Sequence, residues 1–154
     1  MTEAAEPPLC LATGVTADAL KMIEDAGGDG GIYRSSHPWI VASERFREVA
    51  SADGTATLLF YDLDNACFAR WTTIRDIDVV EFHRGRWETQ VRFAALQPVP
   101  EIWAALDSIM LQPSREQLER ERREPVGTSR TPCSRHELSS YAVCEAPVFV
   151  LAPG

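Results

Sequence analysis

The stretch from Thr55 to Leu96 constrains the fold most, because it holds the strongest strand signals in the chain. It begins with a short run of almost wholly apolar or β-branched residues over 55–61, which is typical of a strand buried on both faces. The turn-forming sequence Asp62-Leu-Asp-Asn65 follows. Because Asp and Asn side chains bond to nearby backbone groups, this sequence predicts a hairpin turn after the first strand.

Residues 66–96 predict the rest of an antiparallel meander. Two strands are expected, over 66–74 and 77–82, and the second has a plausible bulge at Val79-Val80. The run from Trp87 to Leu96 has the clearest period of two, which predicts one buried and one wet face. The residues expected to face the core are Trp87, Thr89, Val91, Phe93 and Ala95. No long crossover separates these strands, so a doubly wound parallel sheet is disfavoured.

Short elements are expected before and after the meander. A helix is predicted over 17–26, and Ser43 can cap another over 44–50, behind a strand at Trp39–Ala42. An apolar stripe at helical spacing predicts a helix over 101–111 that covers one face of the sheet.

The C-terminal third carries two capping boxes, Ser114–Gln117 and Ser134–Glu137. They predict a polar helix over 115–124 and a short helix ending near Val143. A last strand over 147–152 is expected to rejoin the sheet beside an early strand, which would close a small barrel.

The predicted fold class is therefore α+β, an antiparallel meander closing toward a small β-barrel and flanked by short helices. A chain of 154 residues suits one domain of common size. We expect that domain to cover residues 13–154, after a loose acidic N-terminal tail over residues 1–12.

The net charge of −8 is unevenly spread: residues 1–65 carry −7 and residues 66–154 carry −1. An acidic half disfavours broad binding to nucleic-acid backbones, although it leaves room for a small nucleobase pocket. The chain has no apolar run of about 18 residues and no signal-peptide pattern, so we expect a cytoplasmic protein with no membrane partner. Its four cysteines would then be mostly reduced.

Motifs for chemistry are few. Cys133, His136 and Cys144 have soft donor atoms near one short helix, and Cys67 or Cys10 could complete a zinc tetrahedron, but the paired Cys-x-x-Cys arrangement of zinc sites is absent. The chain also lacks a nucleophile elbow, a phosphate-binding loop, a dinucleotide fingerprint and a metalloprotease motif. We therefore expect no metal, no cofactor and no catalytic residue, and whether the protein is an enzyme stays open.

Four large aromatic residues fall on or beside the predicted strands: Trp39, Tyr61, Trp71 and Trp87. Aromatic strands in a small barrel can present a stacking pocket for a planar ligand. The alternative is that these side chains fill an ordinary core, as large aromatics commonly do.

Three segments resemble the PUA-like domains, in particular the ASCH and EVE group. They are His37-Pro-Trp-Ile-Val before a capped helix, Thr57-Leu-Leu-Phe-Tyr61, and Phe68-Ala-Arg-Trp-Thr-Thr-Ile74. The resemblance covers roughly residues 37–100 and implies binding of single-stranded RNA or a modified nucleobase between barrel and helices. The residues that it maps to that pocket are Trp39, Ser43, Tyr61 and Trp71.

A rival hypothesis comes from the charge pattern. The acidic half could present carboxylates to a basic protein partner, as an interaction protein or an inhibitor of a nucleic-acid enzyme would do. The carboxylates that would carry this function are Asp18, Glu24, Asp29, Glu44 and Glu48. A third hypothesis is a small enzyme of the cystatin-like cyclase type, which also uses a curved sheet with a cavity.

Overall fold

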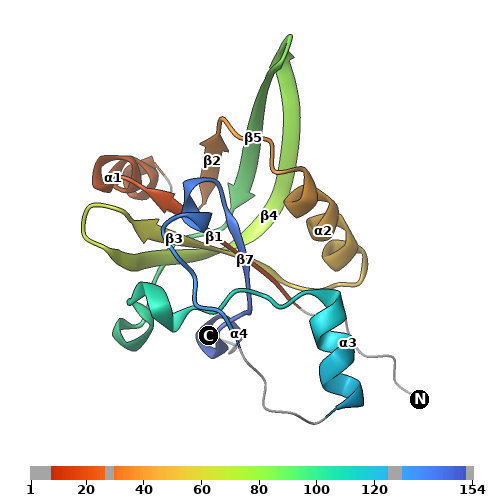
Figure 1. Ribbon diagram of the computed structural model, residues 1–154. Coiled ribbons are helices and arrows are strands. Elements are labelled where there is room, and N and C mark those ends of the chain that lie inside the picture. Colours follow the sequence, from red (N-terminus) through yellow and green to blue (C-terminus); the bar gives the residue numbers. More distant parts are fainter. Residues whose placement is uncertain (1–7, 27–29, 125–129, 152–154) are drawn as a thin grey trace.

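The computed structural model describes residues 8–26, 30–124 and 130–151. Within this part of the chain, seven strands form one sheet in the order β2-β5-β4-β3-β1-β7, with the short β6 beside β4 (Figure 1). Of the strand pairs described, β1 and β3 are parallel and the others antiparallel. The strands are β1 (Leu9–Val15), β2 (Gly31–Ser35), β3 (Ala56–Asp62), β4 (Cys67–His83), β5 (Arg86–Phe93), β6 (Gln97–Pro98) and β7 (Ala142–Cys144).

Short helices cover this sheet, so the predicted α+β class and the β3-β4-β5 meander are confirmed. The helices are α1 (Ala17–Ala26), α2 (Ile40–Ser51), α3 (Arg115–Arg123) and α4 (Val148–Leu151), with 3-10 turns η1 (Glu101–Trp103), η2 (Leu106–Ser108) and η3 (Glu137–Ser139). The predicted closure into a barrel is wrong. Strands β2 and β7 end the sheet on opposite sides, and the outer side of β7 pairs with Leu111 instead of with another strand.

Strand β1 lies inside the sheet, between β3 and β7. Its residues alternate between the two faces of the sheet, and both faces of the strand are buried. A strand buried on both faces carries apolar residues continuously, as Leu9-Cys-Leu-Ala12 does. The predicted loose tail is therefore wrong for residues 9–12, which pack in the core, while residues 1–7 lie outside the described residues.

The sheet separates two hydrophobic clusters. On one face, α1 and α2 pack over Leu11, Leu58 and Phe60. On the other face, η1, η2, η3 and α4 pack over Leu59 and Tyr61. The predicted cover over one face is thus present, but the segment 101–111 forms two 3-10 turns and an extended end instead of one helix.

Tertiary hydrogen bonds explain why the segment 101–111 is not a helix. The backbone N–H of Ser108 bonds to the carbonyl of Ala105 in a 3-10 turn, and its hydroxyl donates to the carbonyl oxygens of Trp103 and Ala105. The carbonyl of Ile109 accepts from the backbone of Cys133, so the chain is extended at that point. Pairing with distant strands has overridden a local helical pattern.

Three further predictions about local structure are corrected. The predicted strand at Trp39–Ala42 is the start of α2, because the carbonyl of Trp39 accepts the first helical bond, from Ser43. The predicted strand at 147–152 is α4, which begins after Pro147, and Ala152 lies outside the described residues. The predicted helix after Ser134 shrinks to η3, and Ala142–Cys144 pairs with β1 instead.

The predicted cap at Ser43 is wrong, because Ser43 lies inside α2 and its hydroxyl donates to the carbonyl of Ile77, but two other predicted caps are confirmed. The hydroxyl of Thr16 accepts the backbone N–H of Ala19 at the start of α1. The hydroxyl of Ser114 accepts that of Gln117 at the start of α3. Both helices are confirmed, because a cap depends only on residues within one turn.

Strand β4 is one long strand where two were predicted. Its first half pairs with β3 and its second half with β5, and the register shifts between Ile74 and Asp76. A second shift lies between Glu81 and His83, near the tip, and not at Val79-Val80 as predicted. Figure 1 shows the outer halves of β4 and β5 standing out from the body as a two-stranded ribbon.

The core face of β5 is largely as predicted. Thr89, Val91 and Phe93 are buried, while the exposed fraction of Trp87 is 37%. The prediction for Trp87 is wrong because this residue lies on the protruding ribbon, past the reach of the helices that cover Val91 and Phe93. Ala95, which follows β5, is half-buried.

We expect Phe93→Ala to lower the free energy of unfolding by about 3–5 kcal/mol, because it removes a buried ring that packs against Phe60. The control, Trp87→Ala, should lower it by less, since 37% of the surface of that residue stays exposed. Denaturant titration followed by circular dichroism measures both values. Equal losses in the two variants would contradict this assignment of buried and exposed positions.

Candidate binding groove between α2 and α3

The four residues predicted to line an aromatic pocket do not come together. Trp39 is fully buried in the cluster beneath α2, between the rings of Tyr33 and Tyr141 at centroid distances of 5.8 Å and 4.9 Å. Ser43 is buried on the same side, where its hydroxyl donates to the carbonyl of Ile77 at 3.4 Å.

The other two residues belong to the opposite face of the sheet. Tyr61 is buried against Phe68, at a centroid distance of 5.0 Å. Trp71 is half-buried and packs edge-on against Phe149 of α4, at 5.9 Å. Since the sheet lies between the two pairs, the four residues cannot share one ligand, and each of these rings fills core space instead.

A cavity of about 380 Å³ lies between α2, α3 and the start of β1. A second cavity of about 280 Å³ continues from it toward α4, and the two share several walls. We call them together the α2–α3 groove. The shared residues are Pro8, Gln112, Pro113 and Leu118; the first cavity adds Leu9, Arg45, Glu48, Val49, Glu119 and Arg122, and the second Cys144, Glu145, Ala146 and Leu151.

Helix α2 supplies one wall of the groove. Arg45, Glu48 and Val49 are spaced at helical intervals of three and four, so they share one face of the helix. Arg45 donates a hydrogen bond of 2.5 Å to the side-chain oxygen of Gln112, which ties this wall to the floor. The backbone N–H of Gln112 in turn bonds to the carbonyl of Val143 in β7. The floor is therefore fixed to the edge of the sheet.

Helix α3 supplies the other wall. Its sequence, Arg115–Arg123, has Leu118 as its only apolar residue, and Leu118 lines both cavities. The sequence signal for this site was present: a polar helix with a single apolar residue either stays solvated or touches a partner. Without the fold, however, nothing in the sequence joins α3 to Pro8 and to residues 45–49.

The walls carry charges of both signs. Arg45 and Glu48 come from α2, and Glu119 and Arg122 come from α3. Between them, Leu9, Val49, Pro113 and Leu118 form the apolar lining. A groove of this kind matches a ligand with an apolar group and flanking charges of both signs, and it has no excess of positive charge for a phosphate.

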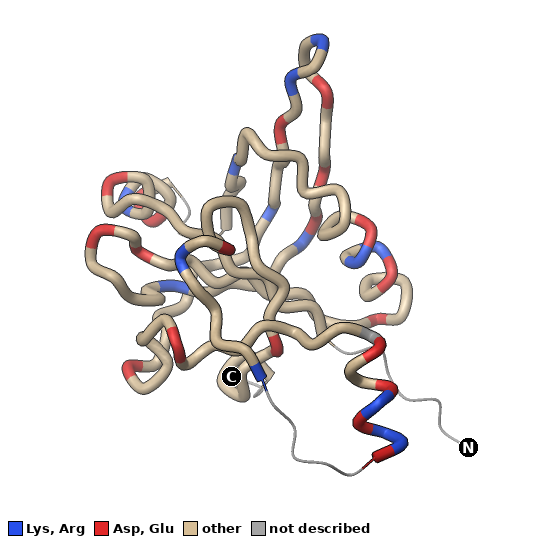
Figure 2. The backbone as a smooth tube through the Cα atoms, in the orientation of Figure 1, with Lys and Arg blue, Asp and Glu red and all other residues tan. Residues whose placement is uncertain are grey.

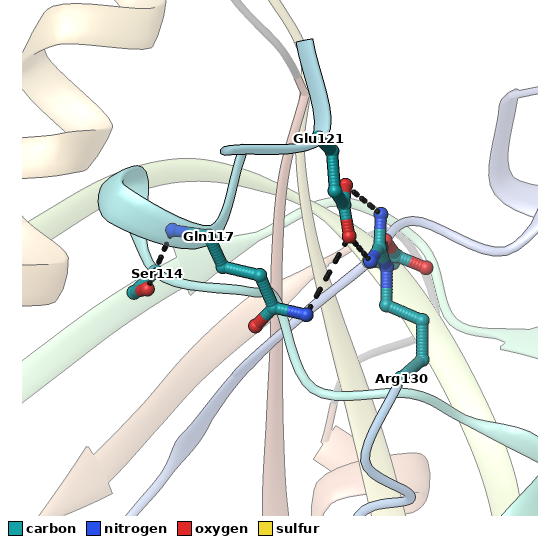
Figure 3. A network of polar contacts seen from close by, with 5 residues as sticks. Ser114, Gln117, Glu121 and Arg130 are labelled. Carbon is teal, nitrogen blue, oxygen red and sulfur yellow. Dashed lines mark hydrogen bonds and ion pairs between the residues drawn. The ribbon is translucent and has the colours of Figure 1, made fainter. Parts of the chain in front are cut away.

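Arg130 holds α3 against the body of the protein (Figure 3). It donates two hydrogen bonds to Glu121 of α3, at 2.6 Å and 3.2 Å, and one to Glu145, at 2.5 Å. These hydrogen bonds from Arg130 hold the pKa of the Glu121 carboxyl below its ordinary value. Arg130 is thus one tether of the outer wall of the groove.

The cysteines predicted as candidate zinc ligands lie in the core below the groove. Cys10, Cys133 and Cys144 are buried in one cluster, whereas His136 is exposed. Among the described residues, no three His, Cys, Asp or Glu side chains are arranged to hold a metal ion. Burial raises the pKa of the Cys10 thiol to about 12, so this thiol stays protonated at neutral pH and is a poor nucleophile.

The carboxylates proposed for an acidic interface do not form one surface. Asp18 and Glu24 belong to α1, whereas Glu44 and Glu48 belong to α2, on the other side of the molecule in Figure 1. Glu24 is also paired with Arg70 at 3.0 Å. Asp29 lies outside the described residues.

No protein-family model matches this chain, and no curated protein matches it at a significant level. The resemblance to PUA-like domains stays a prediction. Of the helices that the structure describes, none is long and apolar enough to cross a membrane.

We expect Arg130→Gln to loosen α3, because both carboxylates then lose their charged donor. The matched control is Arg123→Gln, since Arg123 makes an exposed ion pair at 3.9 Å within α3 itself. Cα chemical shifts of residues 116–123 report the helix content. They should move toward random-coil values in Arg130→Gln and stay near those of the unmodified protein in Arg123→Gln. Equal shifts in both variants would contradict the tether.

The lowered pKa of Glu121 also sets the sign of a pH effect. Its charge stabilises the tethered α3 above the ordinary carboxyl pKa of 4.5, and this contribution is lost as the pH falls through the lowered folded value. The helical shifts of α3 should stay constant from pH 7 to about pH 5 and decline below about pH 4. The same decline in Arg130→Gln would show that another group is responsible.

Proposed function

We propose that this protein is a binding module that holds a short segment of a partner protein in the α2–α3 groove. The single observation that carries this proposal is the groove itself, which has an apolar lining between two walls that each present one cation and one anion. The proposal keeps the protein-interaction hypothesis from the charge pattern, but it moves the contact to a different surface.

A peptide matches the dimensions of the groove. The larger cavity, of about 380 Å³, falls in the size range of small-ligand sites, and the smaller one extends it toward α4. An apolar side chain of the segment would lie between Leu9, Val49 and Leu118. The side-chain amide of Gln112 is placed at the floor, where its nitrogen can donate to a peptide carbonyl.

Charge on the groove walls defines the kind of segment. An acidic residue of the partner would approach Arg45 or Arg122, and a basic residue would approach Glu48 or Glu119. Such rim charges set orientation and specificity more than affinity. A segment with an apolar residue between charges of opposite sign is the best match.

The α2–α3 groove does not support the nucleobase hypothesis. No Trp, Tyr or Phe lines the α2–α3 groove, so it offers no stacking surface for a base. The aromatic residues that the PUA-like resemblance maps to a pocket are divided between the two faces of the sheet. That hypothesis stays a prediction and is an outcome of the test below.

The test is a selection of random linear peptides displayed on phage against the immobilised protein. We expect enriched peptides that carry an apolar residue beside charges of both signs. Their affinity should fall by about tenfold or more for Leu118→Arg, because the variant places a charge in the apolar lining of the α3 wall. The matched control is Ile102→Arg, which changes an exposed residue outside the groove and should bind as before.

Two results would contradict the proposal. One is equal binding of the enriched peptides to Leu118→Arg and to Ile102→Arg. The other is the absence of any enriched peptide together with quenching of tryptophan fluorescence by nucleosides, which would favour the nucleobase hypothesis.

A further inference from the structure

The outer part of the β4–β5 hairpin has a free strand edge. Strand β2 covers β5 only from Thr89 to Phe93. On the other side, α2 reaches β4 at Ile77, whose carbonyl accepts the hydroxyl of Ser43. Beyond this point, β4 pairs with β5 alone over Val79–His83. We call Val79–His83 the free β4 edge.

The backbone direction along this edge follows from Ile77. Because its carbonyl points outward to Ser43, the N–H and carbonyl groups of Val79 and Glu81 point outward too, two and four residues further along. Among the described residues, no strand or side chain bonds to these groups. They are a row of donors and acceptors with the spacing that another strand needs.

Apolar side chains accompany these free backbone groups. Val80 is 38% exposed and Phe82 is 63% exposed. Neither packs in the two hydrophobic clusters of the protein. Exposed strand edges in natural proteins are usually blocked by a charge, a proline or a covering segment, because they otherwise pair with another chain.

Opposite charges lie at equal distances on either side of Glu81 along this edge. Figure 2 shows basic residues at the tip of the ribbon and acidic residues along its arms. Asp78 lies three positions before Glu81, and Arg84 lies three positions after it. Two such edges running in opposite directions therefore bring the acidic arm of each against the basic tip of the other.

We propose that the free β4 edge binds the same edge of a second copy of this chain, as an antiparallel pair about a twofold axis at Glu81. The free length, Val79–His83, is centred on that residue. In this register Val80 faces Phe82 of the second copy, and Asp78 lies beside its Arg84. Glu81 of each copy then exchanges two backbone hydrogen bonds with Glu81 of the other, whereas the register shift after Glu81 turns the backbone groups of His83 toward Arg86.

The charges along this edge are complementary to those of the same edge in a second copy of the chain. Antiparallel self-pairing places opposite charges together at both ends, which an unrelated strand would do only by chance. The two Glu81 side chains face each other at the centre, and like charges directly opposite are destabilising. The dimer is therefore weak and reversible. It leaves the α2–α3 groove open, because that groove lies at the other end of the molecule from the ribbon tip (Figure 1).

Sedimentation velocity over a concentration series tests the proposal on the full chain. The mass should rise with concentration from 17.1 kDa toward twice that value. Asp78→Arg and Arg84→Asp should each weaken the dimer by about tenfold, because each places like charges together at both ends of the pair. The double variant, Asp78→Arg with Arg84→Asp, exchanges the two charges and should restore the affinity of the unmodified protein.

Two more variants complete the design. Glu81→Gln should strengthen the dimer by about threefold, since it removes the one repulsive pair. Asp107→Arg, an exposed residue on η2, is the matched control for charge reversal and should have no effect. The proposal is overturned if Glu81→Gln is monomeric throughout the series. Failure of the double variant to restore pairing would overturn it too, as would growth beyond a dimer.

Discussion

The parallel pairing of β1 with β3 is the constraint on which the rest of the structure depends. Two parallel neighbours cannot be joined by a hairpin, so the chain between them must cross over the sheet. That crossover contains α1, β2 and α2, and both helices lie over the same face. The opposite face, with Cys10, Ala12 and Leu59, is left for the C-terminal third of the chain to cover.

The C-terminal third covers that face mostly with 3-10 turns and extended segments. Its backbone groups bond to one another across these segments, as Leu111 does to Thr131 and Gln112 does to Val143. Thr13, a buried polar residue of β1, donates to the carbonyl of Ser140 at 2.7 Å and so helps to place the chain entering β7. These bonds fix Gln112 and Pro113 under α3, so the α2–α3 groove follows from the way in which the second face is covered.

Sequence reasoning succeeded where the determining interactions are local. The turn at Asp62 is one case, since its carboxylate accepts the backbone N–H groups of Asp64 and Asn65. The caps at Thr16 and Ser114 are others. The alternation from Thr89 to Phe93 also identified a core face, because the strand lies under the helices throughout that stretch.

It failed where distant segments decide the conformation. Strand β1 pairs with a strand more than forty positions along the chain, and its small residues Ala12 and Gly14 gave no strong strand signal. The candidate site had the same difficulty, because its walls come from three separate parts of the chain. The aromatic residues Trp39 and Trp71 were predicted to line one pocket. They pack on opposite faces of the sheet, which depends on the fold and not on the local sequence.

Most of the described helices and strands pack into one of the two hydrophobic clusters. The outer part of the β4–β5 ribbon and helix α3 are the exceptions. The register shift near Asp76 divides β4 into a half that lies in the sheet and a half that extends past the core. The outer half exposes Phe82 and leaves backbone groups without partners inside the protein, which folding alone does not require. Helix α3 likewise contributes Leu118 to a cavity instead of to either cluster. The ribbon and α3 add little to the core, and they are the parts that we propose to make contacts outside the chain.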